Sequence, residues 1–163
     1  MKTLRSFLFG AALALCPLAA QADHWTAVAS TGAMDESAAG IFQFNGPSLS
    51  YLGGGASLLP IVARYNVTNT SGTELPAWNT LELGYLDLNA TGAVQARLIQ
   101  VRPCNGAQQV LCTVVSADNT AATCRSCTFA NQVDFANFLY YVEVTLTRQN
   151  AATNPAALTL RVF

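Results

Sequence analysis

Apolar and polar side chains alternate most regularly in the segment from Phe138 to Arg148. The apolar side of this period-2 pattern consists of Tyr140, Val142, Val144 and Leu146. The wetter side consists of Tyr141, Glu143, Thr145 and Thr147. Because β-branched and aromatic residues suit a pleated, half-buried surface, the pattern predicts a long strand with one buried face. Such a strand requires a sheet beside it and a second layer over its apolar face.

Shorter alternations recur along the chain between turn signals such as Asn45-Gly46-Pro47. They predict strands over residues 25–30, 41–44, 48–52, 61–68, 81–88, 94–102, 110–116 and 158–162. The phase of the pattern slips near Tyr85, where Leu86 and Leu88 take over the apolar side, so a β-bulge is expected there. Residues 117–127 are expected to form a polar loop, and residues 129–137 are compatible with one helical turn.

These eight or nine short strands, with turn signals about every 8–12 residues and no sustained helical period, are typical of an all-β protein. The predicted fold is an antiparallel two-sheet β-sandwich that is jelly-roll-like, with an immunoglobulin-like sandwich as the alternative. Residues 41–163 are expected to form this single domain. Residues 23–40 are rich in small side chains and weakly patterned, so we expect a loosely ordered N-terminal arm.

Residues 1–22 have the pattern of a cleaved bacterial signal peptide. Lys2 and Arg5 form a positive region ahead of an apolar core. The core runs from Phe7 to Cys16, and Ala20-Gln21-Ala22 after it is a small-x-small cleavage site. The core is shorter than the roughly 18 residues that a membrane-spanning helix needs, and no later segment reaches that length. We therefore expect an exported protein, periplasmic or extracellular, without a membrane span.

The charge of the exported part is low and negative. Without Lys2 and Arg5, six arginines and no lysine stand against nine acidic residues, which leaves a net charge of −3. Nucleic acids and anionic membrane surfaces both select basic patches. Neither is therefore an expected partner.

Four cysteines follow the signal segment, Cys104, Cys112, Cys124 and Cys127. An even number of cysteines in an exported chain favours two disulfides. We favour Cys104–Cys112 with Cys124–Cys127 because each pair closes a short local loop, and the two crossed pairings stay open. The spacing fits a zinc knuckle poorly, and the Cys124–Cys127 spacing of a redox dithiol lacks the helix that such chemistry uses.

Asp87, Asn89 and Thr91 place oxygen side chains at alternate positions before Gly92, as in the first half of a calcium loop. The position at which such a loop needs a bidentate Glu is Leu98, inside a predicted strand. An ordinary hairpin turn accounts for the same residues and is the favoured interpretation, with a metal site as the alternative. No cofactor is expected.

Candidate catalytic residues are few. His24 is the sole histidine, and it would have to be the base of any Ser–His–Asp or Cys–His site from a position on the N-terminal arm. A glycosidase needs two carboxylates about 5–9 Å apart, and Glu82 with Glu143 is the best candidate pair. Each of them is explained more simply as a solvated strand residue opposite an arginine. The sequence therefore predicts a protein that is not an enzyme.

Three functions remain as hypotheses. The leading one is an exported, non-enzymatic module that acts through surface contact, by binding a partner or by self-assembly through the arm at residues 23–40. The second is a small carbohydrate-binding domain in which Trp78 and Tyr141 stack on a glycan; the alternative places Trp78 in the core and Tyr141 under a neighbouring loop. The third is the carboxylate-based hydrolase.

Overall fold

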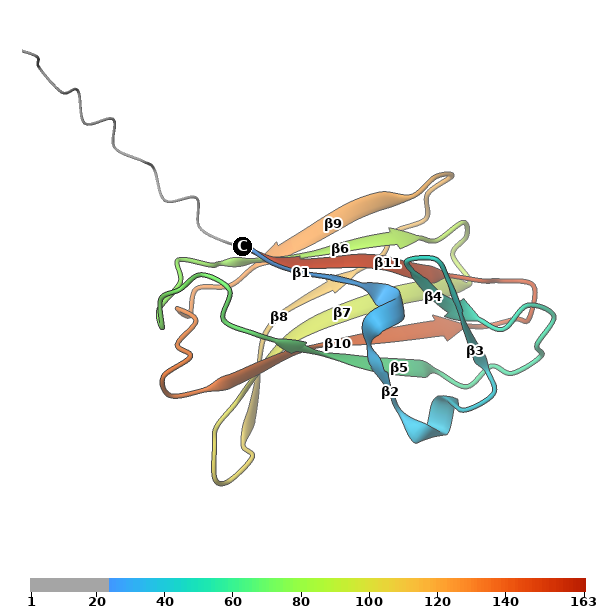
Figure 1. Cartoon of the computed structure of the whole chain (residues 1–163). Helices are drawn as coiled ribbons and strands as arrows, with labels where there is room; N and C mark the ends of the chain where they lie inside the picture. The colour runs from blue at the N-terminus through green and yellow to red at the C-terminus, as the bar shows by residue number, and fades with distance from the viewer. Residues whose placement is uncertain (1–23) are drawn as a thin grey trace, which may run out of the picture.

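The strands of this protein form two antiparallel sheets that pack face to face (Figure 1). The computed structural model describes residues 24–163. Sheet A contains, in spatial order, β3 (Phe42–Asn45), β4 (Ser48–Tyr51), β11 (Ala156–Val162), β6 (Thr80–Leu86) and β9 (Thr123–Thr128). Sheet B contains β2 (Ala33–Met34), β5 (Ile61–Val67), β10 (Leu139–Arg148), β7 (Gly92–Val101) and β8 (Gln108–Val115). A further strand, β1 (Trp25–Val28), pairs with β11 in sheet A.

The order of the strands identifies the sandwich as a jelly roll. Among the eight strands from β4 to β11, sheet A takes the first, eighth, third and sixth in spatial order. Sheet B takes the second, seventh, fourth and fifth. The chain therefore crosses between the sheets as two Greek keys do in a jelly roll, and not as in an immunoglobulin sandwich. This confirms the predicted fold class and decides between its two variants.

The alternation on β10 creates the middle of the core. Its ten residues pair with β5 on one side and β7 on the other. The predicted apolar set faces sheet A and is fully or almost fully buried. From sheet A, Leu49, Tyr51, Leu81, Leu83 and Leu160 close the other side of the same core. The burial of both inner faces is the main stabilising contribution to this fold.

Two strands were not predicted from the sequence. β9 lies within the expected polar loop, and its sequence Thr-Cys-Arg-Ser-Cys-Thr has no apolar alternation. It is the edge strand beside β6 and pairs with residues 80–85 over its whole length. β2 has only two residues and pairs with β5. Both strands are defined by backbone hydrogen bonds to a neighbour, which a hydropathy pattern does not report.

The expected bulge near Tyr85 lies on the partner strand instead. The register between β6 and β11 shifts between Ala157 and Thr159, so Leu158 is the extra residue. β6 itself keeps its phase through Leu86, and Asp87 rather than Leu88 takes the next buried position. The prediction was wrong on this point because Asp87, the buried residue directly after β6, is polar and interrupts the apolar pattern although the alternation of burial continues.

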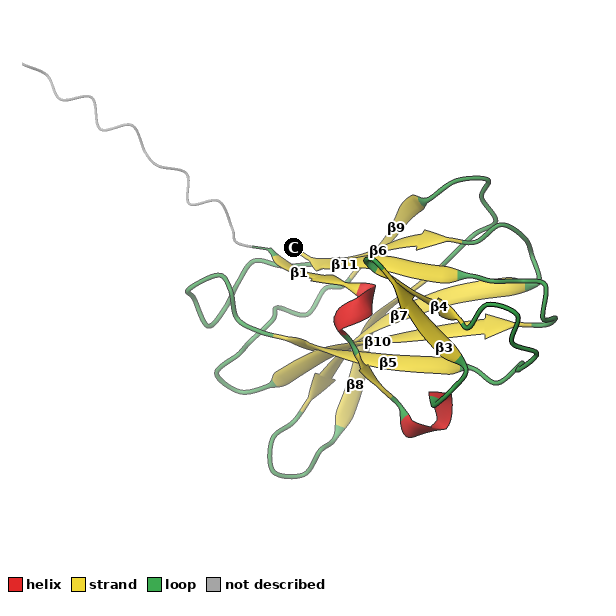
Figure 2. Ribbon diagram, turned by 45° about the vertical axis from the view of Figure 1, so that its right-hand side comes forward, coloured by secondary structure: helices red, strands yellow, loops and turns green. Residues whose placement is uncertain are grey.

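The segment at residues 25–34, which we call the crossing segment, closes one lateral side of the sandwich (Figure 2). It runs from β1 in sheet A through the 3-10 helix η1 (Ala29–Thr31) to β2 in sheet B. Trp25 and Ala29 are buried, and the buried Tyr65 hydroxyl donates a hydrogen bond of 2.7 Å to the Ala29 carbonyl. A Cβ on Gly32 would lie 2.5 Å from the Tyr65 ring, so only glycine lets the chain pass this close.

The crossing segment therefore differs from the loosely ordered arm expected for residues 23–40. Its strands pair with this chain's own β11 and β5, and a second 3-10 helix, η2 (Glu36–Ala38), continues the ordered backbone. The small residues of this segment led to the prediction of a loosely ordered arm. In the structure they fit under neighbouring side chains, and Ala29 and Ala38 are fully buried. Small size allows close packing as well as disorder.

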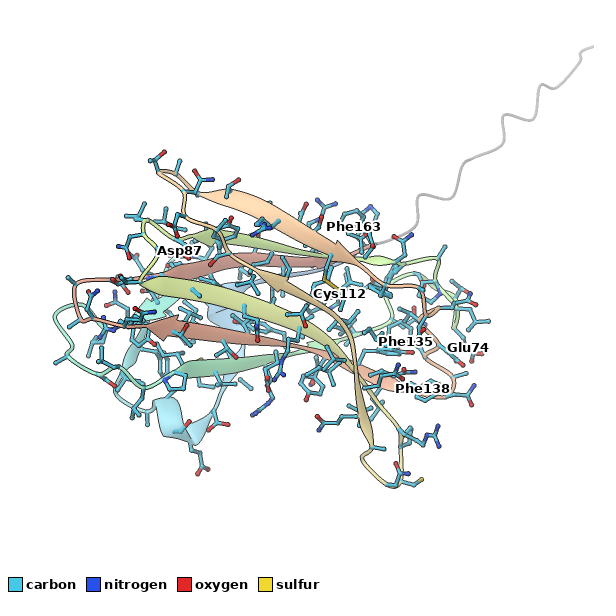
Figure 3. All side chains as sticks on the ribbon, turned by 180° about the vertical axis from the view of Figure 1, so that it is seen from behind. Glu74, Asp87, Cys112, Phe135, Phe138 and Phe163 are labelled. Atoms are coloured by element: carbon cyan, nitrogen blue, oxygen red, sulfur yellow. A yellow bond between two sulfur atoms is a disulfide. The ribbon has the colours of Figure 1, made fainter. Side chains whose placement is uncertain are left out.

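A disulfide between Cys112 and Cys127 closes the opposite lateral side (Figure 3). It joins β8 of sheet B to β9 of sheet A, and the two Cα atoms lie 6.1 Å apart. The favoured pairing of Cys104 with Cys112 and Cys124 with Cys127 is therefore wrong. Residues three apart on a strand are separated by about 10 Å and point to opposite faces, so Cys124 and Cys127 cannot be bridged. Cys104 and Cys124 are exposed free thiols.

The signal-peptide prediction for residues 1–22 lies outside the described residues. Between residues 24 and 163, none of the helices has the length and apolar character required to cross a membrane.

Candidate interaction surface

The outer edge of β3 is an unpaired hydrogen-bonding edge of sheet A. β3 pairs with β4 from Phe42 to Asn45, and no other described strand lies on its far side. In an antiparallel ladder, alternate residues turn their backbone groups toward the neighbouring strand. The Leu52 amide donates to the Ile41 carbonyl at 2.9 Å, which places residues 41, 43 and 45 on the side of β4. The backbone N–H and C=O groups of Phe42 and Phe44 therefore point outward.

The side chains of the same two residues form an aromatic pair on one face of this edge. Their rings lie 5.2 Å apart between centroids. They share the inner face of sheet A with Leu49 and Tyr51, which are buried. β3 lies at the end of the sheet, however, and Phe44 keeps 45% of its surface exposed. The edge thus presents unpaired backbone groups and an exposed aromatic side chain together.

The surrounding sequence carries no charge. From Ser37 to Ala63 there is no aspartate, glutamate, lysine or arginine. This stretch holds four of the ten exposed large hydrophobic residues among residues 24–163, namely Phe44, Leu52, Leu58 and Leu59. Monomeric β-proteins usually protect an edge with a charge, a proline or a bulge. None of these is present within β3 itself.

The edges on the other lateral side are protected. β8 contains a register shift opposite Leu98 and Ile99, and the disulfide fixes it to β9. β9 carries Arg125, whose guanidinium donates to the Val115 carbonyl of β8 at 2.9 Å. A bulge, a cation and a covalent bond therefore restrict strand addition on that side.

A chain of ion pairs crosses the outer face of sheet B. Glu143 on β10 lies between Arg64 on β5 and Arg97 on β7, and it is only 7% exposed. Arg64 bonds both Glu143 and Asp35, each at 3.1 Å, and Arg97 bonds Glu143. Hydrogen bonds from the Ser37 side chain and amide, followed by the Arg64 guanidinium, lower the pKa of the Asp35 carboxyl. The ion pairs join neighbouring strands of one sheet. Because the two positive and two negative charges cancel, this row of residues has no net charge that would attract a charged ligand.

The geometry separates the proposed hydrolase pair. Glu82 lies on the outer face of sheet A and bonds Arg161 at 3.2 Å, whereas Glu143 lies on the outer face of sheet B. Two packed sheets are about 10 Å apart, and these carboxylates point away from each other on opposite sides. They cannot flank one glycosidic bond.

His24 is exposed and lies edge-on to Phe163 at 5.4 Å between ring centroids.

The two proposed glycan-stacking residues lie in different environments. Trp78 is 2% exposed and sits edge-on to Phe135, with ring centroids 5.8 Å apart, so its face is not available for stacking. Tyr141 is partly exposed on the outer face of sheet B, and its hydroxyl donates to Gln108 at 3.1 Å. The structure therefore does not bring the two rings together.

The proposed metal ligands belong to a polar network at one end of the sandwich, where Figure 3 shows Asp87. Asp87 is 2% exposed, and its Oδ2 accepts a bond of 2.5 Å from Ser116. Asn89 accepts bonds from the Thr91 amide and hydroxyl, as in an ordinary turn. Asp87 Oδ1 has no hydrogen-bond partner and lies against Gly92, where an added Cβ would be 3.2 Å away. Among residues 24–163 there is no cluster of three or more His, Cys, Asp or Glu side chains suited to a metal ion.

The candidate interaction surface at β3 was not identified from the sequence, although part of its signal is present there. The alternation Phe-Gln-Phe-Asn predicts a strand, but it does not say whether that strand is central or at an edge. The uncharged stretch from Ser37 to Ala63 is visible in the sequence and could have marked the region. Only the strand order shows that its first strand is left with an open side.

Comparisons with known proteins add structural likeness alone. No family model and no curated protein matches the chain. Among solved structures, one of infectious bursal disease virus, Gt strain, is similar with a TM-score of 0.36 and 13% identity, covering 98% of this chain and 37% of that chain. Another, of the Gx strain, has a TM-score of 0.35 and 15% identity, covering 86% of this chain and 31% of that chain. This protein spans about a third of the length of those chains, and its jelly-roll assignment rests on its own strand order.

Proposed function

We propose that this protein is a non-enzymatic module that acts by adding a strand of another polypeptide to the outer edge of β3. The observation that carries the proposal is the combination of outward backbone groups with an aromatic pair, of which Phe44 is exposed, on an edge without charge. Main-chain hydrogen bonds supply affinity in strand addition, and alternate side chains supply selectivity. The fold is compatible with this use because a sandwich leaves its terminal strands open.

The proposal includes export. The leader pattern of residues 1–22 supports it, and a disulfide that links the two sheets is typical of oxidising compartments. Association through the arm at residues 23–40 remains a separate prediction. β1 already pairs with this chain's own β11, which leaves only its other edge for a second chain, whereas β3 combines an unpaired edge with an exposed aromatic side chain.

A peptide titration followed by NMR tests strand addition. The probe is a synthetic peptide of residues Gly40–Gly46, flanked by lysines for solubility. We expect the Phe42 and Phe44 amides to become protected from hydrogen exchange, while the Gln43 and Asn45 amides, which face β4, are already protected. Phe42 and Phe44 amides that are unprotected both in the free protein and at saturating peptide would reject strand addition at this edge.

Carbohydrate binding remains the second candidate because Tyr141 presents part of its ring on a sheet face. Asn66 and Ile99 flank it in register, and Gln108 holds its hydroxyl. A glycan array with the parent and with Tyr141→Ala tests this function, and Thr145→Ala on the same face is the control. Binding that is unchanged by Tyr141→Ala, or no binding to any glycan, would reject it.

A further inference from the structure

We infer that the partner strand at β3 is β3 of a second copy of this chain, paired antiparallel about a two-fold axis. This inference rests on the proposed function and names its partner. It would join the two copies of sheet A into one continuous sheet. A two-fold contact uses the same surface on both copies, so the surface must be complementary to itself.

The register centred on Gln43 satisfies this requirement and pairs both outward residues of β3. When Gln43 faces Gln43 of the second copy, Phe42 of each copy lies opposite Phe44 of the other. Phe42 and Phe44 are the residues whose backbone groups point outward, so each opposing pair exchanges two hydrogen bonds. Residues that are opposite in an antiparallel ladder turn their side chains to the same face. The four phenylalanine rings therefore gather on one face, which a slip by one residue would prevent.

The distribution of charge disfavours a charged partner strand and is compatible with a second copy. The protein carries more acidic than basic residues, so most surfaces of two identical copies repel weakly. The stretch from Ser37 to Ala63 contains no charged residue, and contact between two copies of it brings no like charges together. A charged partner would find no complementary group on this edge. Identical neutral edges therefore suit each other.

The test combines the oligomeric state with a matched pair of variants. Sedimentation of the purified protein should show a concentration-dependent dimer, and Phe44→Lys should raise its dissociation constant at least about tenfold. Val110→Lys on β8 is the control, because Val110 is 46% exposed and Phe44 is 45% exposed. Phe44→Thr keeps a β-forming residue and replaces Phe44→Lys if the lysine variant does not fold.

Hydrogen exchange locates the contact. In the dimer the Phe42 and Phe44 amides should be protected, and dilution or Phe44→Lys should remove that protection. A protein that stays monomeric at high concentration overturns the inference. So does a dimer that is unaffected by Phe44→Lys, an oligomer larger than two, or new protection at Thr26–Val28 on β1. A monomer that still protects these amides with the Gly40–Gly46 peptide would refute the second copy and leave strand addition intact.

Discussion

The two lateral sides of the sandwich are closed by different means. On one side a covalent bond, Cys112–Cys127, fixes β8 to β9. On the other side the crossing segment at residues 25–34 passes from sheet A to sheet B and is held by packing and by the hydrogen bond from Tyr65. The disulfide side has protected edges, whereas β3 pairs with β4 alone and its outer edge has no strand beside it among the described residues. The covalently fixed side of the molecule therefore differs from the side with β3, where the candidate interaction surface lies.

Replacement of Trp25 should have the largest effect on the free energy of unfolding, and it tests the side closed by the crossing segment. The buried indole anchors the crossing segment at its first residue. Deletion of a large buried aromatic leaves a cavity, and we expect Trp25→Ala to lower the free energy of unfolding by about 3–5 kcal/mol. Urea denaturation measures the change. Thr26→Ala, at the exposed neighbouring position, should stay within about 0.5 kcal/mol. An equal effect of both substitutions would mean that Trp25 does not anchor this side.

Loss of the disulfide should have the next largest effect. The bond closes a loop with a sequence separation of 15, for which loop-closure entropy predicts about 3 kcal/mol. We expect the Cys112→Ala, Cys127→Ala double variant to lose about this much stability in urea denaturation under oxidising conditions. Cys104→Ala and Cys124→Ala are controls, because both thiols are exposed and free. Equal loss in the control variants would point to a different pairing.

Removal of one hydroxyl should have a smaller effect. In Tyr65→Phe the Ala29 carbonyl loses its donor within the buried side of the crossing segment. An unsatisfied buried acceptor costs about 1–3 kcal/mol, and we expect the free energy of unfolding to fall within that range. Burial also raises the pKa of the Tyr65 hydroxyl, which stays protonated and able to donate. Tyr141→Phe, which removes an exposed hydroxyl contact, should lower the free energy of unfolding less. A larger loss in Tyr141→Phe than in Tyr65→Phe would contradict the stabilising role of the Tyr65 hydrogen bond.

The smallest expected effect concerns Asp35, which joins the end of the crossing segment to sheet B through Arg64. Its pKa is lowered by Ser37 first and by Arg64 second. Because the pKa is lower in the folded state, ionised Asp35 stabilises the fold above the unfolded value of about 3.9, and this contribution disappears as the pH falls below the folded pKa. An NMR titration should find a midpoint below the ordinary value, and Ser37→Ala should raise it. Ser71→Ala, at a distant turn, should leave the midpoint unchanged.

The candidate site could be predicted only in part. The β3 strand follows from Phe-Gln-Phe-Asn, and the turn after it follows from Asn45-Gly46-Pro47. Trp78 was a candidate for glycan stacking with a core position as the alternative, and only the structure shows that it is buried, because one aromatic residue in a loop sequence does not report its own burial. Glu82 and Glu143 have similar strand contexts in the sequence but lie on opposite faces of the molecule. The side of the molecule on which a strand residue lies depends on the sheet to which its strand belongs. That assignment is decided by pairing between strands far apart in the chain.

The sequence by itself determined the layers of this protein. Period-2 alternation along β5 and β10 and the repeated turn signals require two sheets with apolar inner faces, since each half-buried strand must cover another. The tertiary structure alone decided what lies at the borders of those sheets. Pairing of β9 through its backbone, the bond between Cys112 and Cys127, and the open edge of β3 all depend on contacts between residues far apart in the chain. Hydrophobic patterning acts through each strand's own residues, whereas edges and crosslinks are set by which strands become neighbours.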